Sequence, residues 1–462
     1  MRVLGWCALG AAALLAGPAF AQTAAEHAPA AALPFDPDVA TRQWLDTMDP
    51  AARARSDQQF EGLYWIQFVG PLIGFVVAFL FLQLGWAKAL RNGARKTLKF
   101  YVLATFAFAA IYALVGAVVS FPWDYWVGFI RQHEYGLSTQ NFNQWFTEYL
   151  IGFGLNLVIG SFAITIFYLI LAAAKKTWWI WGSLAAIAFA VVSLALAPVY
   201  ISPMFNTYIS MPDSPLKQSV LQMAQANGVP ATDVQQYDRS RQTESVSANV
   251  SGFGETTHIS LADTLIQRES PGGVRAVLGH EIGHYVLNHN VSILLMISVL
   301  IFVVFALTQI LFTRISANSR WDIKDIADPA GMPLLFSIIG FLFLIATPIQ
   351  NNIIRFHEHQ ADMFGLNAAR EPDGFAESAL LLSEYRKMEP TPFEEWFFYD
   401  HPSGYDRIHM AMVWKAHHMA IGDIPMGPGG PPPGWHPHFV TGGETPTAPA
   451  ATPAASPAAP SN

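Results

Sequence analysis

The sequence predicts a mainly α-helical fold, that of a polytopic membrane helical protein with a small α+β insertion. Hydrophobic residues make up 52% of the chain and charged residues only 13%, about half the charged share of a typical soluble protein. A buried helix of a soluble protein could explain one long apolar run, but six together indicate membrane spans. The six runs are 63–88, 101–121, 150–174, 178–201, 291–313 and 333–350.

The N-terminal part of the chain is expected to lie outside the cytoplasm. Residues 1–21 resemble a signal peptide, because Arg2 is followed by an Ala/Leu-rich core and by the small-x-small site Ala19-Phe20-Ala21. An uncleaved first membrane helix is the alternative for this segment. Residues 22–60 are predicted to form a loosely ordered extracytoplasmic arm, and residues 61–201 to hold four transmembrane helices.

Basic residues gather in three short loops, which join the first span to the second, the third to the fourth and the fifth to the sixth. The positive-inside rule places these loops in the cytoplasm and the two long polar segments on the opposite side. Because the N-terminus also resembles a bacterial signal, we expect an integral protein of a bacterial inner membrane. The basic residues are Lys88, Arg91, Arg95, Lys96, Lys99, Lys175, Lys176, Arg314, Arg320 and Lys324.

Residues 202–290 are predicted to be the small α+β insertion between the fourth and fifth spans. Helical apolar spacing covers 214–227 and stops at Gly228. Residues 245–262 look extended, with a turn at Gly252-Phe253-Gly254. A further helix is expected after Pro271-Gly272-Gly273.

The remaining chain divides into three parts. Residues 291–350 should form a transmembrane helical hairpin, and residues 421–462 are Pro/Gly/Ala-rich and predicted to be a disordered tail. Residues 351–420 are expected to return to the side of the insertion and complete its domain, with helices near 352–370, 374–388 and 404–419.

The helix after residue 273 carries His280-Glu281-Ile282-Gly283-His284, which is an H-E-x-x-H pattern. His280 and His284 lie one turn apart on the same helical face, so both imidazoles can bind one zinc ion. Glu281 then lies where a carboxylate can take a proton from a water molecule that the metal polarises. Two solvated histidines are the alternative. With Cys7 as the single cysteine, any metal must be held by histidines and carboxylates.

Topology points to Glu358 as the third metal ligand. If the hairpin 291–350 is antiparallel and its helices continue past the membrane, Glu358 and the motif emerge on one side at similar heights. Asp362 follows one turn later and could accept the free N–H of a ligating histidine, although a solvated carboxylate is as compatible with this position. His357 and His359 flank Glu358 but point about 100° to either side, and are expected to be partly solvated.

Several spaced segments of residues 120–410 resemble the type I CAAX prenyl protease family of integral-membrane zinc metalloproteases. The segments are His280–His284 continuing to Asn288-His289, Glu358-His359-Gln360-Ala361-Asp362, Glu134-Tyr135-Gly136-Leu137-Ser138, Pro203-Met204-Phe205-Asn206, Asp238-Arg239-Ser240-Arg241, and His401-Pro402-Ser403 followed by Arg407.

The resemblance implies that His280, His284 and Glu358 hold Zn²⁺ and that Glu281 is the general base. It also implies that Asp362 contacts one of the metal ligands without binding the metal itself. It also implies that His401 and Arg407 approach the site and help to stabilise the oxyanion of the transition state; a loop histidine and a structural arginine are the alternatives. The substrate strand of the family looks like Ser247, Ala248, Asn249 and Val250, where a peptide could add as a β-strand. An ordinary edge strand is equally compatible with these four residues.

Three features depart from the family. Ser247 stands where the family commonly has Asn, only the N-terminal segment could supply a seventh span, and the outward catalytic face differs from the cytosolic site of eukaryotic members. Because the signals in the sequence look bacterial, CAAX specificity is not carried over to this chain.

These patterns together predict an integral-membrane zinc metalloendopeptidase that hydrolyses peptide bonds of membrane-associated or exported proteins, with the bilayer as its other partner. A non-enzymatic membrane scaffold with a structural metal is the alternative. An intramembrane zinc protease would place H-E-x-x-H inside an apolar run, whereas here Asn288, His289 and Asn290 follow the motif. A net charge of −8 with few basic residues gives no indication of nucleic-acid binding. The substrate, the cleavage site and the oligomeric state are not predicted.

Overall fold

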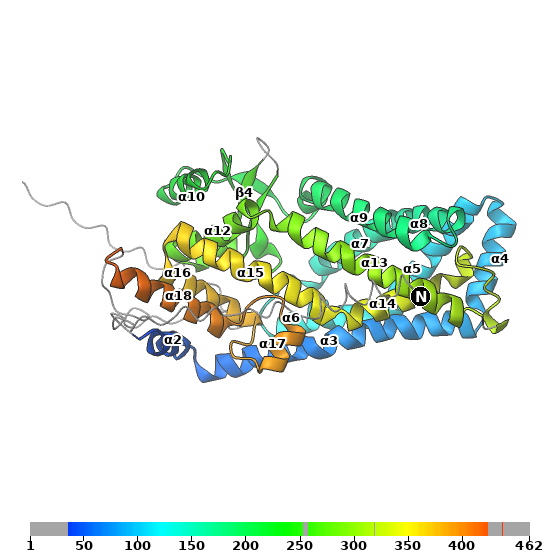
Figure 1. Ribbon diagram of the computed structural model, residues 1–462, viewed down its shortest axis with the longest axis horizontal. Helices are drawn as coiled ribbons and strands as arrows, with labels where there is room; N and C mark the ends of the chain where they lie inside the picture. The colour runs from blue at the N-terminus through cyan, green and yellow to red at the C-terminus, as the bar shows by residue number, and fades with distance from the viewer. Residues whose placement is uncertain (1–35, 253–256, 318, 424–436, 438–462) are drawn as a thin grey trace, which may run out of the picture.

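The computed structural model describes residues 36–252, 257–317, 319–423 and 437, and is drawn in Figure 1. The expected signal segment 1–21 and nearly all of the expected tail 421–462 lie outside the described residues. The elongated molecule has its apolar helices at one end and its sheet at the other (Figure 1).

The described chain also contains short π- and 3₁₀-helices. They are η1 Trp126–Ile130, η2 Asn156–Gly160, η3 Ala197–Ile201, η4 Ser202–Met204, η5 Arg239–Arg241, η7 Ser319–Trp321, η8 Pro329–Gly331 and η9 Leu382–Tyr385.

Five helical segments of the described chain are long and apolar enough to cross a membrane, and they overlap the first five predicted runs. Residues from all five segments join one apolar cluster, which includes Phe108, Tyr168 and Trp178, all fully buried. The segments are α3 (Pro50–Gln83); α5 (Tyr101–Tyr125) continuing through η1 and α6 (Arg131–Glu134); α7 (Phe142–Leu155) continuing through η2 and α8 (Ser161–Ala173); α9 (Trp178–Leu196) continuing through η3 and η4; and α13 (His289–Ile315).

The sixth predicted run is a bent pair of helices, α14 (Met332–Ile345) and α15 (Thr347–Ala369), with 53° between them. The pair counts as a sixth span if α14 and α15 cross the membrane as one bent segment. Pro348 lies in the first turn of α15, and proline has no N–H to donate to the preceding turn. The bend falls where that backbone hydrogen bond is lost.

The N-terminal arm is more ordered than predicted. Helix α2 (Pro37–Leu45) begins after Asp36, whose side chain accepts the N–H of Asp38, and α3 begins at Pro50. Trp44 and Leu45 are each 1% exposed and pack in a cluster with side chains of the C-terminal helices. The loosely ordered arm expected for residues 22–60 is thus wrong for 37–45 and 50–60, because distant helices bury the apolar face of α2.

The three basic loops meet at one end of the bundle. Helix α4 (Trp86–Leu98) carries Arg91, which is 2% exposed and contacts Asp328 at 2.6 Å and Asp322 at 2.9 Å. From the loop after α8, Lys175 contacts Asp325 at 2.7 Å. These ion pairs join all three loops at the end that lies opposite the sheet (Figure 1).

The predicted α+β insertion is a four-stranded sheet with its helices. The strands β1 (Tyr208–Ser210), β2 (Val234–Tyr237), β3 (Ala248–Ser251) and β4 (His258–Ala262) lie in the order β1-β2-β4-β3. Only β2 and β4 run parallel; the other two pairs are antiparallel. The associated helices are α10 (Pro215–Ala226), α11 (Asp263–Arg268) and α12 (Pro271–Val286).

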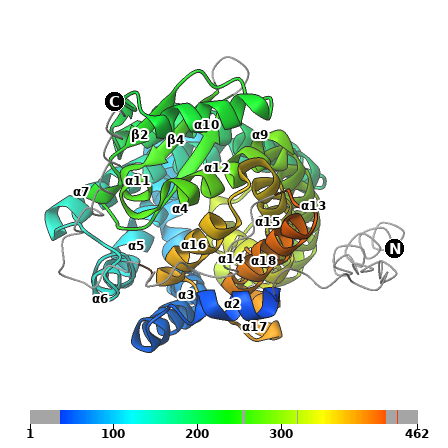
Figure 2. The ribbon, with the colours of Figure 1, turned by 90° about the vertical axis from the view of Figure 1, so that its left-hand side faces the viewer.

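Helix α12 packs between the sheet and the C-terminal helices. Its fully buried Leu278 and Ile282 join Ile259 and Leu261 of β4 in one apolar cluster. Its other sides contact α15 and α16 (Pro372–Leu381), while α18 (Gly404–Ala420) packs on α16 and α2 (Figure 2). The three helices expected in 351–420 are present, and a short one, α17 (Pro392–Phe398), was not predicted.

Candidate active site and metal centre

Local sequence fixes where the motif helix begins. The Ser270 hydroxyl accepts the N–H of Gly273 at 3.1 Å, and Pro271 occupies the first turn, where a missing N–H costs nothing. Helix α12 then runs unbroken to Val286. His280 and His284 therefore lie one turn apart on the side turned away from the sheet cluster.

Small residues allow α12 and α15 to approach closely. A Cβ atom on Gly365 would lie 2.8 Å from the backbone nitrogen of His280, and one on Gly283 would lie 3.2 Å from Cα of Ala361. A Cβ on Gly279 would lie 3.0 Å from the carbonyl oxygen of Gly365. Larger side chains would separate the backbones that carry the candidate ligands. These glycines were missed in the sequence, although their spacing of four residues on α12 was visible there.

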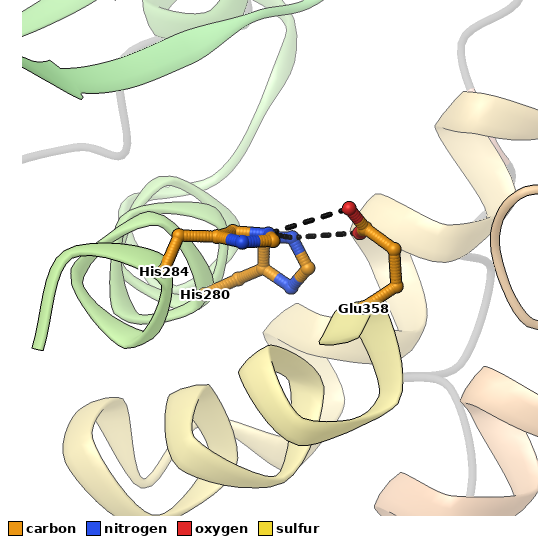
Figure 3. Close-up of side chains that lie close together, drawn as sticks. All are labelled: His280, His284 and Glu358. Atoms are coloured by element: carbon orange, nitrogen blue, oxygen red, sulfur yellow. Dashed lines mark hydrogen bonds and ion pairs between the residues drawn. The ribbon is translucent and has the colours of Figure 1, made fainter. Parts of the chain in front are cut away.

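The three predicted ligands converge at this contact. The Nε2 atoms of His280 and His284 lie 3.0 Å apart, and they lie 3.2 and 3.4 Å from the two carboxylate oxygens of Glu358 (Figure 3). One ligand atom from each residue falls within 4.8 Å of the others. Two imidazoles and a carboxylate form a donor set that suits zinc.

Asp362 orients His280 from behind. Its side chain is completely buried, and its Oδ1 lies 2.7 Å from Nδ1 of His280. An N–H at Nδ1 donates to this oxygen, so Nε2 keeps its lone pair directed towards Glu358. Arg407 Nη2 donates to the same oxygen at 2.5 Å. Asp362 therefore holds both a candidate ligand and Arg407.

Three further histidines lie near the candidate ligands, and one of them contacts His284. His357 is 1% exposed and contacts the carbonyl oxygen of Ile353 through Nδ1 and the hydroxyl of Ser292 through Nε2. His359 is exposed. The buried His289 has its Nδ1 3.0 Å from Nδ1 of His284, on the side of that ring away from Glu358. The contact of His289 with His284 was not predicted, although residue 289 belongs to the resembling segment.

A cavity of about 190 Å³ opens beside His280, one of the candidate metal ligands. Glu281, His401 and Arg407 line it together with His280. Burial raises the pKa of the Glu281 carboxyl above its usual value, as expected for a carboxylate removed from water. The cavity thus brings three of the predicted catalytic residues next to a predicted ligand.

His401 reaches the site from the loop between α17 and α18. Its Nε2 lies 3.1 Å from Oε2 of Glu358, and its Nδ1 lies 2.7 Å from Oδ1 of Asp400. Burial lowers the pKa of His401. Arg407 is 8% exposed and lies over the ring of Phe375.

The predicted substrate strand borders the same cavity. Ser247 and Ala248 line it, while Asn249 and Val250 follow on β3 and pair with Ser260 and Ile259 of β4. In the described sheet β3 is a terminal strand. A terminal strand is the kind of edge to which a further extended chain can add.

Comparison with known proteins gives two family matches. Peptidase family M48 matches residues 210–415, which contain all the candidate site residues. The family described as CAAX prenyl protease N-terminal, five membrane helices, matches residues 43–207, where the described chain has four apolar spans.

Curated relatives cover most of the chain. The uncharacterized metalloprotease YhfN of Bacillus subtilis is 25% identical over 369 residues, which are 79% of this chain and 86% of the relative. CAAX prenyl protease 1 of Saccharomyces cerevisiae is 26% identical over 340 residues, covering 67% of this chain and 73% of the yeast protein. The crystal structure of Ste24p from S. mikatae superposes with a TM-score of 0.66 at 20% identity, covering 81% of this chain and 94% of that one. This last likeness establishes the fold.

Proposed function

The chain belongs to peptidase family M48 and is an integral-membrane metalloprotease, and we propose that zinc is its metal and that His280, His284 and Glu358 bind it. The convergence of two imidazole nitrogens and one carboxylate within 4.8 Å carries this proposal. Oε2 of Glu358 is buried and makes no hydrogen bond of regular geometry within the described chain, although Nε2 of His280 and Nε2 of His401 lie 3.2 and 3.1 Å from it. A buried carboxylate oxygen without such a partner fits a cation in its place.

Zinc, when bound, supplies a Lewis acid that polarises a scissile carbonyl and makes water a stronger acid. Glu281 acts as the general base: it accepts a proton from the attacking water, whose oxygen bonds to the carbonyl carbon. As the C–N bond breaks, Glu281 returns that proton to the leaving amine. Its place in the cavity beside His280 supports this role.

His401 and Arg407 are proposed to stabilise the oxyanion that develops at the scissile carbonyl. Both line the cavity, and N–H donors directed at such an oxygen commonly contribute several kcal/mol. Arg407 is also held by Asp362, so we assign Asp362 a positioning role for His280 and Arg407 together.

The substrate is proposed to bind as an extended peptide along β3, at Ser247, Ala248, Asn249 and Val250. The cavity begins at the start of this strand and continues to Glu281, so main-chain pairing would lead a peptide bond towards the general base. Membrane-associated or exported proteins are the substrates we propose, with the catalytic face outside the cytoplasm of a bacterial inner membrane. The basic loops at the opposite end of the bundle support this orientation.

Glu281→Gln tests the mechanism. The amide keeps the shape of the side chain but cannot accept the proton, so cleavage should fall by about 10²-fold or more while the metal content stays at the wild-type level. Purified protein would be assayed with unfolded protein substrates by mass spectrometry, and its metal measured by elemental analysis. Glu61→Gln, at a half-exposed carboxylate, is the matched control.

The alternative of a non-enzymatic scaffold is not favoured by the family membership. Wild-type protein that holds one zinc per chain and cleaves no peptide would nevertheless support it. A fully active Glu281→Gln variant would instead overturn the assignment of the general base and leave the peptidase activity standing.

A further inference from the structure

Helix α17 presents aromatic side chains to the outside of the molecule. Phe393 is 63% exposed and Trp396 is 46% exposed, and they lie three residues apart on one helical face. Both views place α17 at the periphery, next to α3 and where the apolar end of the molecule meets the catalytic end (Figures 1 and 2). Exposed aromatic side chains grouped in this way mark a surface that is covered in the native environment.

The outer face of α17 continues the surface of a membrane span. Phe397 lies 6.1 Å, between ring centroids, from Phe68 of α3, which is itself 38% exposed. On its inner side, Phe398 stacks on Tyr64 of α3 at 3.9 Å. Because α3 crosses the bilayer, the aromatic face of Phe68, Phe393 and Trp396 is contiguous with surface that contacts lipid.

The backbone groups at the ends of α17 are satisfied by side chains instead of by solvent. At the N-terminus, Thr391 and Glu394 form a reciprocal capping pair. At the C-terminus, Asn352 donates to the carbonyl oxygen of Trp396 at 2.9 Å, and Asn351 donates to that of Phe397 at 2.8 Å. A helix whose terminal groups need no water can lie in the water-poor boundary of a bilayer.

Arg355 completes this arrangement from α15. Its guanidinium donates to the carbonyl oxygens of Glu395 and Tyr399. The three donors on α15 lie directly after the apolar run that ends at residue 350, so α17 is held at the level where that span leaves the membrane.

We propose that α17 is an interfacial helix, with Phe393 and Trp396 inserted among the lipid headgroups and upper acyl chains of the bilayer leaflet on the catalytic side. Aromatic side chains favour this layer because their rings are apolar and Trp can still donate to water or headgroups. The loop from α17 to α18 carries His401, and Glu358 lies seven residues beyond Asn351, about 10 Å along α15. The position of α17 in the interface therefore sets how far Glu358 and the other candidate metal ligands lie above the bilayer.

Site-directed spin labelling tests the proposal, because Cys7 is the single cysteine of the chain. In a Cys7→Ala background, Phe393→Cys and Trp396→Cys would each be labelled with a nitroxide in vesicles of equal parts phosphatidylcholine and phosphatidylglycerol. Leu72→Cys, 56% exposed on α3, is the control within the span, and Val413→Cys, 42% exposed on α18, is the control in water. Collision rates with oxygen and with a water-soluble nickel chelate would be compared.

The ratio of oxygen to nickel collisions should exceed one at positions 72, 393 and 396 and fall below one at 413. A ratio below one at either 393 or 396 in a folded variant, as judged by its elution as one species in size-exclusion chromatography, would overturn the proposal. The collision ratio is measured separately at positions 393 and 396, so the proposal can be tested even if only one of the two labelled variants folds. The measurement needs neither metal nor substrate, and its outcome is separate from that of the peptidase assay.

Discussion

The Nδ1 atom of His280 lies 2.7 Å from Oδ1 of Asp362, and this contact joins α12 to α15 behind the candidate metal ligands. Asp362 is completely buried, and the same oxygen also accepts Arg407. One carboxylate thus contacts both a candidate metal ligand and the guanidinium of Arg407, which lines the candidate substrate cavity. Its loss should affect metal binding and catalysis separately.

Asp362→Asn should weaken zinc binding by about 10- to 100-fold, as changes behind a ligating histidine commonly do. The neutral amide is a poorer acceptor for His280 and leaves Arg407 without its counter-charge. Zinc affinity would be measured by competition with a chromogenic chelator. Peptidase activity would be measured at saturating zinc, where any remaining loss of activity is assigned to the altered position of Arg407. Asp373→Asn, which removes a carboxylate that binds Lys415 at 2.6 Å, is the control. Unchanged zinc affinity in Asp362→Asn would contradict the positioning role.

Gly365→Ala should destabilise the site by overpacking. The added methyl group would lie 2.8 Å from the backbone nitrogen of His280, so α15 must move away from α12 at a cost of about 1–3 kcal/mol. A lower melting temperature and weaker zinc binding are expected together. Gly152→Ala on α7 has no neighbour within 4 Å of the added atom and serves as the control. If Gly365→Ala melts and binds zinc like the wild type, close packing of these helices does not build the site.

Sequence patterns were sufficient for the features that depend on local composition. The apolar runs predicted six spans because each run is long enough to cross a bilayer core, and five of them are single helical segments of the described chain. The H-E-x-x-H spacing placed His280 and His284 on one helical face. The expected contact of Glu358 with this face was also found. It arises without straight helices, since Asn288 breaks the chain with a left-handed φ of 53° and α15 is bent away from α14.

Features that depend on distant packing could not be predicted in the same way. Helix α2 is ordered because α16 and α18 bury its Trp44. The sequence of residues 22–60 does not indicate that these two distant helices pack against it. Likewise α17 is short, and it is held by Asn351, Asn352 and Arg355 of another helix. Propensity over seven residues is weak beside such tertiary contacts.

Glu269→Gln should stabilise the protein increasingly as pH rises. Burial, and then the Glu377 carboxylate, raise the pKa of Glu269 well above its ordinary value of 4.5. The folded state therefore keeps a proton that the unfolded chain releases, and stability declines as pH rises from 4.5 towards the folded pKa. Glutamine is always neutral and can still accept the hydroxyl of Ser378, which contacts Glu269 at 3.1 Å.

Melting temperatures of the wild type and Glu269→Gln would be compared from mildly acidic to mildly alkaline buffer. The variant should match the wild type at the acidic end and melt on the order of a few degrees higher at the alkaline end. Asp213→Asn, at a side chain that is 96% exposed, should show no such divergence. A difference that stays constant with pH would assign the effect to packing and contradict a titrating Glu269.

Labelling of single cysteines should reveal the orientation of the protein in the membrane. Thr177 is exposed in a short basic loop that the Lys175–Asp325 contact ties to the end opposite the sheet, whereas Val413 is exposed on α18. In the Cys7→Ala background, a membrane-impermeant maleimide added to intact bacterial spheroplasts should label Val413→Cys at once and Thr177→Cys only after permeabilisation. The positive-inside rule requires this order, because the loop that contains Thr177 carries Lys175 and Lys176. The reverse order would place the metal-binding group in the cytoplasm and exclude exported proteins as its substrates.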